Sequence, residues 1–149
     1  MQIANNIVSA VTDPQGNHVF IEDGTTASAS SLGTTLMDGT VRIRWGSGQV
    51  YSLAGFQTAF PGKGVGALNA DPRFVNPATS DYRLQVGSPA VDAGITASVY
   101  ATFQTLYGLD IAKDLAGTTR PQGPAYDIGA YEFAASGVGL SSPSQLQVK

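Results

Sequence analysis

The stretch that most decides the fold is Gly87-Ser88-Pro89-Ala90-Val91-Asp92-Ala93-Gly94. It predicts two tight turns, because proline pre-sets φ, glycine permits a positive φ and aspartate hydrogen-bonds to nearby backbone. Further along the chain, the run Tyr126-Asp127-Ile128-Gly129-Ala130-Tyr131-Glu132-Phe133 predicts a strand. Residues 95–109 lie between the two runs and predict a helix, since apolar residues recur there at helical spacing.

Before this stretch the chain consists of short predicted strands separated by turns. Residues 18–22 predict one strand, and residues 40–45 predict another in which apolar residues and arginines alternate. Residues 25–35 read as a loop or a weak strand, and residues 52–60 predict a short helix with Ser52 as its N-cap. The uneven strand spacing fits partial coils of a solenoid, and it also fits a β-sandwich.

The composition excludes several classes of protein. Of 149 residues, 13% are charged and 42% are hydrophobic, with 18 glycines, no cysteine and a net charge of −3. The low charge excludes a charged helical bundle, the negative balance excludes a basic nucleic-acid binder, and the lack of cysteine excludes a disulfide scaffold. No stretch reaches the roughly 18 apolar residues of a membrane span. Residues 1–10 lack the features of a signal peptide. If the protein is secreted, we therefore expect this sequence to be part of a longer chain.

Five motifs follow one another in a fixed order through the second half of the chain. They are DPRFV (71–75), DYRL (81–84), GSPAVDAG (87–94), DLAGTTRP (114–121) and DIGAYE (127–132). This ordered series resembles the C-terminal module of bacterial right-handed parallel β-helix proteins, known as the choice-of-anchor Q domain. The start Asn5-Asn6-Ile7-Val8 is also similar to an Asn-containing turn in a β-helix coil.

The resemblance implies a mostly-β fold: the terminal coils of a right-handed parallel β-helix with an irregular C-terminal capping module and one or two short helices. It divides the chain into coils at 1–68, a choice-of-anchor-like capping module at 69–133 and a linker at 134–149. Residues 142–148 resemble the first strand of a fibronectin type III-like domain. This similarity suggests that a further domain begins there.

Most residues of the motifs are expected to be structural. Aspartates in turns accept backbone N–H groups, and the apolar members are suited to fixing loops on the last coil. The structural motif residues are Asp71, Pro72, Phe74, Asp81, Tyr82, Leu84, Ser88, Pro89, Asp92, Gly94, Asp114, Gly117, Arg120, Pro121, Asp127, Gly129, Tyr131 and Glu132.

Arg120 is the most informative charge in this set. Its planar guanidinium predicts a bidentate pair with Asp127, Asp114 or Glu132. Asp127 and Glu132 are five residues apart, so a regular strand would direct them to opposite faces. That arrangement argues against a glycosidase acid/base pair, whose two carboxyl groups must flank one bond.

Other candidate chemistries have weaker support in the sequence. His18 is the single histidine, and no G-x-S-x-G elbow accompanies it. The glycine-rich run 62–67 has neither the preceding strand nor the following helix of a dinucleotide site, so it predicts a flexible turn. No cofactor is expected, with calcium as the minor alternative. The candidate calcium ligands are Asp110 with Asp114, and Asp71 with Asp81.

One strand face is a candidate glycan-binding surface. Arg42 and Arg44 share this face, and Trp45 and Tyr51 are close to them in sequence. The alternation directs Trp45 away from the arginines. A solvated strand face without a ligand is therefore the alternative interpretation.

These observations predict a non-catalytic capping and anchoring region of a secreted or cell-surface β-helix protein, whose parent the resemblance relates to polysaccharides. Two alternatives stay open: a carbohydrate-binding or adhesin module, and part of a polysaccharide lyase or glycoside hydrolase with its active site in upstream coils. The expected partners are those coils and a polysaccharide. Ile7, Val19 and Ile21 are expected at an exposed coil end, where unpaired strands favour end-to-end self-association.

Overall fold

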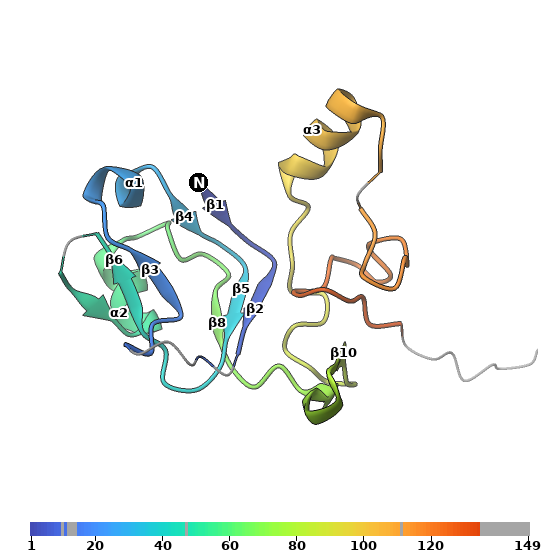
Figure 1. Cartoon of the computed structure of the whole chain (residues 1–149), viewed down its shortest axis with the longest axis horizontal. Helices are drawn as coiled ribbons and strands as arrows, with labels where there is room; N and C mark the ends of the chain where they lie inside the picture. Colours follow the sequence, from blue (N-terminus) through green and yellow to red (C-terminus); the bar gives the residue numbers. More distant parts are fainter. Residues whose placement is uncertain (10, 12–14, 47, 111, 135–149) are drawn as a thin grey trace, which may run out of the picture.

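The architecture is mostly β, built from short strands with a few short helices (Figure 1). The computed structural model describes residues 1–9, 11, 15–46, 48–110 and 112–134, so the expected linker lies outside them from residue 135 onward. The strands are β1 (Gln2–Ile3), β2 (Asn6–Val8), β3 (Val19–Ile21), β4 (Ser31–Leu32), β5 (Thr35–Met37), β6 (Ile43–Trp45), β7 (Val50–Tyr51), β8 (Leu68–Asn69), β9 (Phe74–Asn76) and β10 (Asp81–Leu84). The helices are α1 (Gly24–Ser28), α2 (Leu53–Ala59), the 3₁₀ helix η1 (Pro77–Thr79) and α3 (Ser98–Tyr107).

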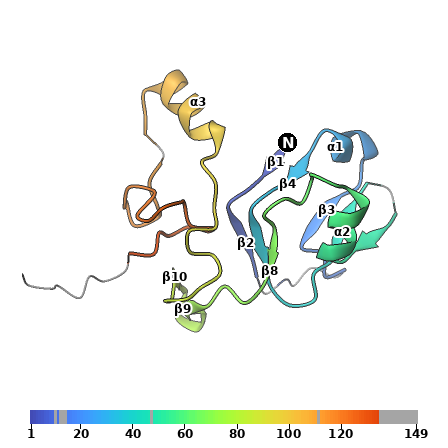
Figure 2. The same cartoon turned by 180° about the vertical axis from the view of Figure 1, so that it is seen from behind.

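Strands that are far apart in the sequence pair in parallel. β1 pairs with β4 and β2 with β5, both at an offset of 29 residues. β3 pairs with β6 at an offset of 24 residues, and β5 pairs with β8 at an offset of 32 residues. The chain therefore returns beside its own path, and β2, β5 and β8 lie side by side (Figure 1, Figure 2). The β6–β7 and β9–β10 pairs are antiparallel, so the sheets are small and mixed.

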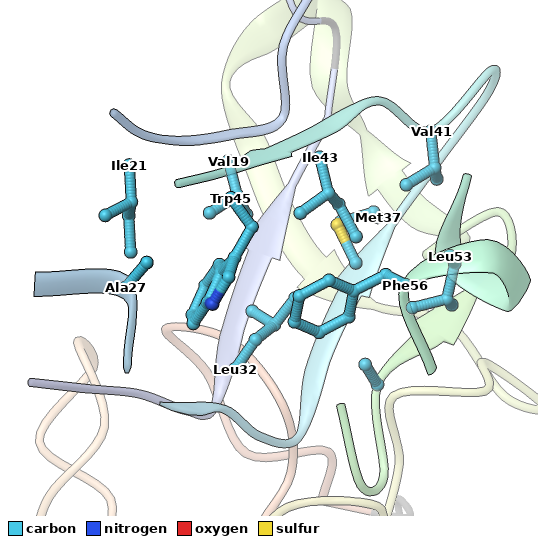
Figure 3. Close-up of a cluster of buried hydrophobic side chains, with 11 residues drawn as sticks. Val19, Ile21, Ala27, Leu32, Met37, Val41, Ile43, Trp45, Leu53 and Phe56 are labelled. Atoms are coloured by element: carbon cyan, nitrogen blue, oxygen red, sulfur yellow. The ribbon is translucent and has the colours of Figure 1, made fainter. Parts of the chain in front are cut away.

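The larger of two apolar clusters fills the space between β3, β5, β6 and α2 (Figure 3). The alternation predicted in residues 40–45 is confirmed, because Val41, Ile43 and Trp45 are buried in this cluster whereas Arg42 is exposed. Full burial of side chains of this size contributes roughly 1.5–3 kcal/mol each. This cluster therefore stabilises the first part of the chain.

The helix predicted at residues 52–60 is confirmed as α2. The Ser52 hydroxyl oxygen accepts a hydrogen bond from the Gly55 N–H at 3.1 Å, as an N-cap does. Phe56 is fully buried and packs edge-on against Trp45, with 5.0 Å between the ring centroids. The helix thereby closes one side of the larger cluster.

The β2–β5–β8 sheet carries apolar side chains on both faces, and this connects the two halves of the chain. Side chains alternate across a strand, so Met37 belongs to the larger cluster while its neighbour Leu36 belongs to the second one. Leu36 lies in register with Ile7 and Leu68. These three residues form an outward row, and Ile128 of the C-terminal region packs against it.

The C-terminal region consists largely of turns and loops. β9 and β10 form a hairpin, with η1 between the two strands. The helix predicted at residues 95–109 is confirmed as the shorter α3, which ends at Tyr107 and is followed by Gly108 with φ of 67°. α3 stands away from the strands in both views (Figure 1, Figure 2). None of the helices in the described part of the chain is long and apolar enough to cross a bilayer.

Two segments differ from the sequence predictions. The strand predicted at residues 126–133 is wrong, because the segment forms successive bends and its donors are used elsewhere: Ile128 N–H donates to the Ala90 carbonyl at 2.9 Å. The weak strand or loop predicted at residues 25–35 is wrong in part. α1 forms there because the Asp23 carboxylate accepts a hydrogen bond from the Thr26 N–H at 2.5 Å and caps the helix.

The prediction that Ile7, Val19 and Ile21 are exposed at a coil end is wrong. Val19 and Ile21 are only 8% and 7% exposed because they point into the larger cluster, and Ile7 packs against the C-terminal region. The backbone edges of the described strands at this end do lack neighbours. Among the described residues, β1, β2 and β3 each have a paired strand on one side only.

Candidate functional site

Acidic side chains of the motifs gather where three C-terminal loops meet. Asp127 lies at the centre of this network. One of its carboxylate oxygens accepts a hydrogen bond from the Asp92 N–H at 2.7 Å, and the other accepts from the Phe133 N–H. The Asp92 carboxylate in turn accepts from the Ala125 N–H at 3.3 Å. These contacts tie residues 125–133 to the loop that contains Asp92.

Glu132 joins the same network and pairs with Arg120. Its Oε1 accepts a hydrogen bond from the Asp127 N–H at 3.1 Å, and its Oε2 accepts from the Gln122 N–H at 3.0 Å. The Arg120 Nε lies 3.3 Å from Glu132 Oε1, as an ion pair without hydrogen-bond geometry. Glu132 is thus the partner among the three expected for Arg120. The pair is not bidentate, because Arg120 Nη2 donates to the Gly129 carbonyl at 2.6 Å.

Asp114 holds a third loop in the network. Its Oδ1 accepts a hydrogen bond from the Thr118 N–H at 2.7 Å, and its Oδ2 accepts from the Glu132 N–H at 3.1 Å. Burial by itself would raise the pKa of Asp114, but the N–H groups of Glu132, Thr118 and Ala116 together outweigh burial. The pKa of Asp114 is therefore lowered from its ordinary value of 3.8.

The pKa of Asp127 moves in the opposite direction. Burial raises it, and the negative charges of Glu132 and Asp92 add to that rise, while the N–H groups of Asp92 and Phe133 act against it. The expectation that Asp127 and Glu132 face opposite ways is wrong, because their segment is not a strand and both belong to one network. All four of their carboxylate oxygens accept backbone N–H groups, as turn-fixing carboxylates do.

Asn5 connects this region with the strands, a role that the sequence analysis missed. It adopts φ of 56°, in the left-handed region that asparagine tolerates. Its side-chain oxygen accepts hydrogen bonds from the Ile95 N–H at 2.9 Å and from the Thr34 hydroxyl at 2.7 Å, and its amide donates to the Ile95 carbonyl at 2.7 Å. The Gly129 N–H donates to the Asn5 carbonyl at 3.0 Å. The Asn5-Asn6 pair was the available signal, and it indicated only a turn.

Other motif residues fix turns or permit close backbone contacts. The Asp71 carboxylate accepts a hydrogen bond from the Arg73 N–H at 2.8 Å, and the Ser88 hydroxyl donates to the Pro72 carbonyl at 2.7 Å. A Cβ atom at Gly94 would lie 2.7 Å from the Tyr126 carbonyl oxygen, so this position requires glycine. The same group of loops contains Pro89, Gly117, Pro121 and Tyr131.

The β9–β10 hairpin carries four further motif residues in different environments. Leu84 is buried in the second cluster, and Phe74 packs against that cluster. Tyr82 is 47% exposed, and its ring meets Phe74 edge-on at a centroid distance of 5.3 Å. The partly buried carboxylate of Asp81 pairs with the exposed Arg83 at 2.6 Å, and this hydrogen bond lowers the pKa of Asp81.

Two hollows meet at this hairpin. The larger has a volume of about 710 Å³ and is lined by Asp38, Asp71, Arg73, Phe74 and Tyr82, among other residues. The smaller has a volume of about 340 Å³, and Phe74 and Tyr82 line it as well. The two rings therefore form a ridge between the hollows.

The structure does not bring the four candidate glycan-binding residues onto one surface. Arg42 Nε donates to the Gln15 carbonyl at 3.0 Å. Arg44 lies 3.4 Å from a Glu22 carboxylate oxygen and 5.2 Å from the centre of the Phe20 ring. Trp45 is buried, as the alternation indicated, and Tyr51 packs edge-on against Phe60 at 5.4 Å. Neither Trp45 nor Tyr51 therefore forms a stacking surface beside the two arginines.

His18 and the candidate calcium ligands are engaged in local hydrogen bonds. His18 Nε2 lies 2.8 Å from the Asp38 carbonyl, and the Arg42 N–H donates to His18 Nδ1 at 3.4 Å. A neutral imidazole with its proton on Nε2 satisfies both contacts. Asp110 accepts a hydrogen bond from the Ala112 N–H at 2.8 Å. Within the described ranges, no three histidine, aspartate or glutamate side chains come close enough to hold a metal ion.

A scan against protein-family models, a search of curated proteins and a search of solved structures each gave no match.

Proposed function

We propose that this chain forms the terminal coils of a right-handed parallel β-helix, with a C-terminal module packed on one outer face. The parallel pairings at offsets of 24 to 32 residues support this architecture, since solenoid repeats run from about 20 residues upward. Besides the β5–β8 pair, two backbone hydrogen bonds on either side of β8 support a third coil. The Leu32 N–H donates to the Lys63 carbonyl at 2.7 Å, and the Ala70 N–H donates to the Met37 carbonyl at 3.1 Å.

The role of this region is to cap and connect, and it is not catalytic. The observation that carries the proposal is the engagement of the buried carboxylates. The two oxygens of Asp114, of Asp127 and of Glu132 each accept a backbone N–H group. A catalytic acid or base must instead reach the substrate at hydrogen-bond distance. Asp127 and Glu132 are 2% and 9% exposed, which favours a structural role over such contact.

The C-terminal module covers an apolar surface that would otherwise contact water. The row of Ile7, Leu36 and Leu68 faces away from the larger cluster, and Ile128 and Ala90 pack against it. Parallel sheets are normally covered on both faces. The unpaired edges of β1, β2 and β3 are where preceding coils of a longer secreted or cell-surface protein would stack.

The turnover of uronate-containing polysaccharides tests the non-catalytic role. The intact chain is incubated with polygalacturonate and with alginate. Formation of unsaturated uronate ends then reports β-elimination, and release of reducing ends reports hydrolysis. We expect no product above a heat-inactivated control. Product formation that is proportional to the concentration of the folded protein and is absent from the heat-inactivated control would overturn the proposal.

A further inference from the structure

The ridge of Phe74 and Tyr82 has the geometry of a ligand platform. Tyr82 keeps 47% of its surface exposed, and Phe74 supports it edge-on at 5.3 Å. The hollow of about 710 Å³ beside this ridge lies within the range of about 300–1,000 Å³ typical of small-molecule sites. An exposed ring with a fixed orientation binds at a lower entropic cost than a mobile one.

The polar groups around the larger hollow supply both donors and acceptors. One Asp38 oxygen accepts a hydrogen bond from the Ser9 hydroxyl at 2.7 Å, and one Asp71 oxygen accepts from the Arg73 N–H at 2.8 Å. In the part of the chain that the structure describes, the second oxygen of each carboxylate and the Arg73 guanidinium have no hydrogen-bond partner. Gln85 also lines the hollow. The site therefore offers unused acceptors and donors beside an aromatic face.

We propose that this hollow binds a neutral saccharide, with Tyr82 as the stacking platform. A sugar ring has an apolar C–H face that can cover an aromatic ring, and its hydroxyl groups both donate and accept hydrogen bonds. The hydroxyl groups donate to Asp38 and Asp71 and accept from Arg73. The two carboxylates disfavour an acidic polysaccharide, and the guanidinium disfavours a basic peptide. This site goes beyond the capping role and differs from the Arg42/Arg44 face.

The hollow beside Arg42 provides a comparison. It has a volume of about 450 Å³ and is lined by His18, Asp38 and Arg42, among others. Its described lining includes no tyrosine, phenylalanine or tryptophan. It therefore lacks the stacking platform that the Phe74–Tyr82 ridge supplies.

A titration of the intact, ¹⁵N-labelled chain locates the ligand. The probes are xylohexaose, cellohexaose, mannohexaose and maltohexaose, with hexagalacturonate and hexalysine as charged comparisons. We expect at least one neutral probe to shift the Arg73, Tyr82 and Gln85 amide signals saturably and to leave Arg42 and Arg44 unchanged. The proposal is overturned if no neutral probe shifts these signals, if a charged probe binds more tightly, or if the shifts centre on Arg42.

Matched tyrosine variants test the platform. Tyr82→Ala is expected to raise the dissociation constant of the neutral probe by about tenfold or more, whereas Tyr82→Phe keeps binding close to that of the wild type. Tyr107→Ala is the control, because Tyr107 is 64% exposed on α3 and lines neither hollow. Equal affinity of Tyr82→Ala and the wild type contradicts the proposal. If Tyr82→Ala does not fold, Asp71→Asn replaces it, because Asp71, unlike Asp38, does not line the hollow beside Arg42. Weakened binding is then expected, and unchanged binding contradicts the site.

Discussion

Residues 1–69 and residues 70–133 are held together by different interactions. The first region relies on parallel strand pairs and on one apolar cluster of buried side chains. In its described residues, the second has one two-stranded hairpin, an isolated bridge between Lys113 and Thr119, and a small apolar cluster. Its loops are fixed by carboxylates that accept backbone N–H groups. Irregular loops can therefore be ordered by a few buried carboxylates whose oxygens all accept backbone N–H groups.

The largest effect is expected from breaking the buried ion pair of the second region. Glu132→Gln removes the charge opposite Arg120, whose side chain is only 6% exposed. Removing one partner of a buried pair typically destabilises a protein by about 3–5 kcal/mol. Chemical denaturation measures this loss in the free energy of unfolding. Glu22→Gln is the control, because Glu22 is the exposed partner of Arg44 and surface pairs contribute about 0–1 kcal/mol. Equal effects of the two variants would contradict the account.

The two faces of the β2–β5–β8 sheet can be distinguished by adjacent residues. Leu36→Ala and Met37→Ala each remove a fully buried side chain, and each is expected to cost about 2–5 kcal/mol. Hydrogen exchange separates them. Leu36→Ala should speed exchange of the Ile128 amide in the C-terminal region, whereas Met37→Ala should speed exchange of the Gly46 amide, which bonds to the Ile21 carbonyl. The same exchange pattern in both variants would show that the sheet does not separate two clusters.

A smaller effect is expected from breaking the connection between the regions. Asn5→Ala removes three side-chain hydrogen bonds to Ile95 and Thr34, and leaving such groups unsatisfied costs about 1–3 kcal/mol. Asn6→Ala is the matched control, because the Asn6 amide reaches only the nearby Ala4 carbonyl. Denaturation and exchange of the Ile95 amide check the prediction. It fails if Asn6→Ala is as destabilising as Asn5→Ala.

The smallest effects are opposite responses to acid within the carboxylate network. The pKa of Asp114 is lowered from 3.8, so its carboxylate stabilises the fold above that pH, and the stabilisation is lost as the pH falls through the folded-state pKa. The pKa of Asp127 is raised, so its ionised form costs stability, which acidification through the folded-state pKa restores.

Unfolding by urea across a pH series measures both responses. As the pH falls, the stability advantage of the wild type over Asp114→Asn should shrink. As the pH falls through the raised pKa of Asp127 toward 3.8, the wild type should gain stability relative to Asp127→Asn. Parallel pH profiles for the wild type and both variants would contradict the assigned pKa directions.

The sequence was informative where local patterns decide the structure. The alternation in residues 40–45 and the Ser52 cap of α2 were predictable, because period and capping act within a few residues. The partner of Arg120 was among the three expected, because the loops contain few charges. The segment 126–133 was not predictable as bends, since the partners of its backbone groups lie in distant loops. Asn5 reaches Ile95 across 90 residues, far beyond any local pattern.

The most direct test of the account is the set of methyl–methyl nuclear Overhauser effects from Leu36 in the intact chain. The account predicts contacts to Leu68 on the neighbouring parallel strand and to Ile128 of the C-terminal module. Contacts from Leu36 to Ile43 of the larger cluster, without contacts to Ile128, would contradict the proposal that the module packs on the outer face of a parallel coil stack.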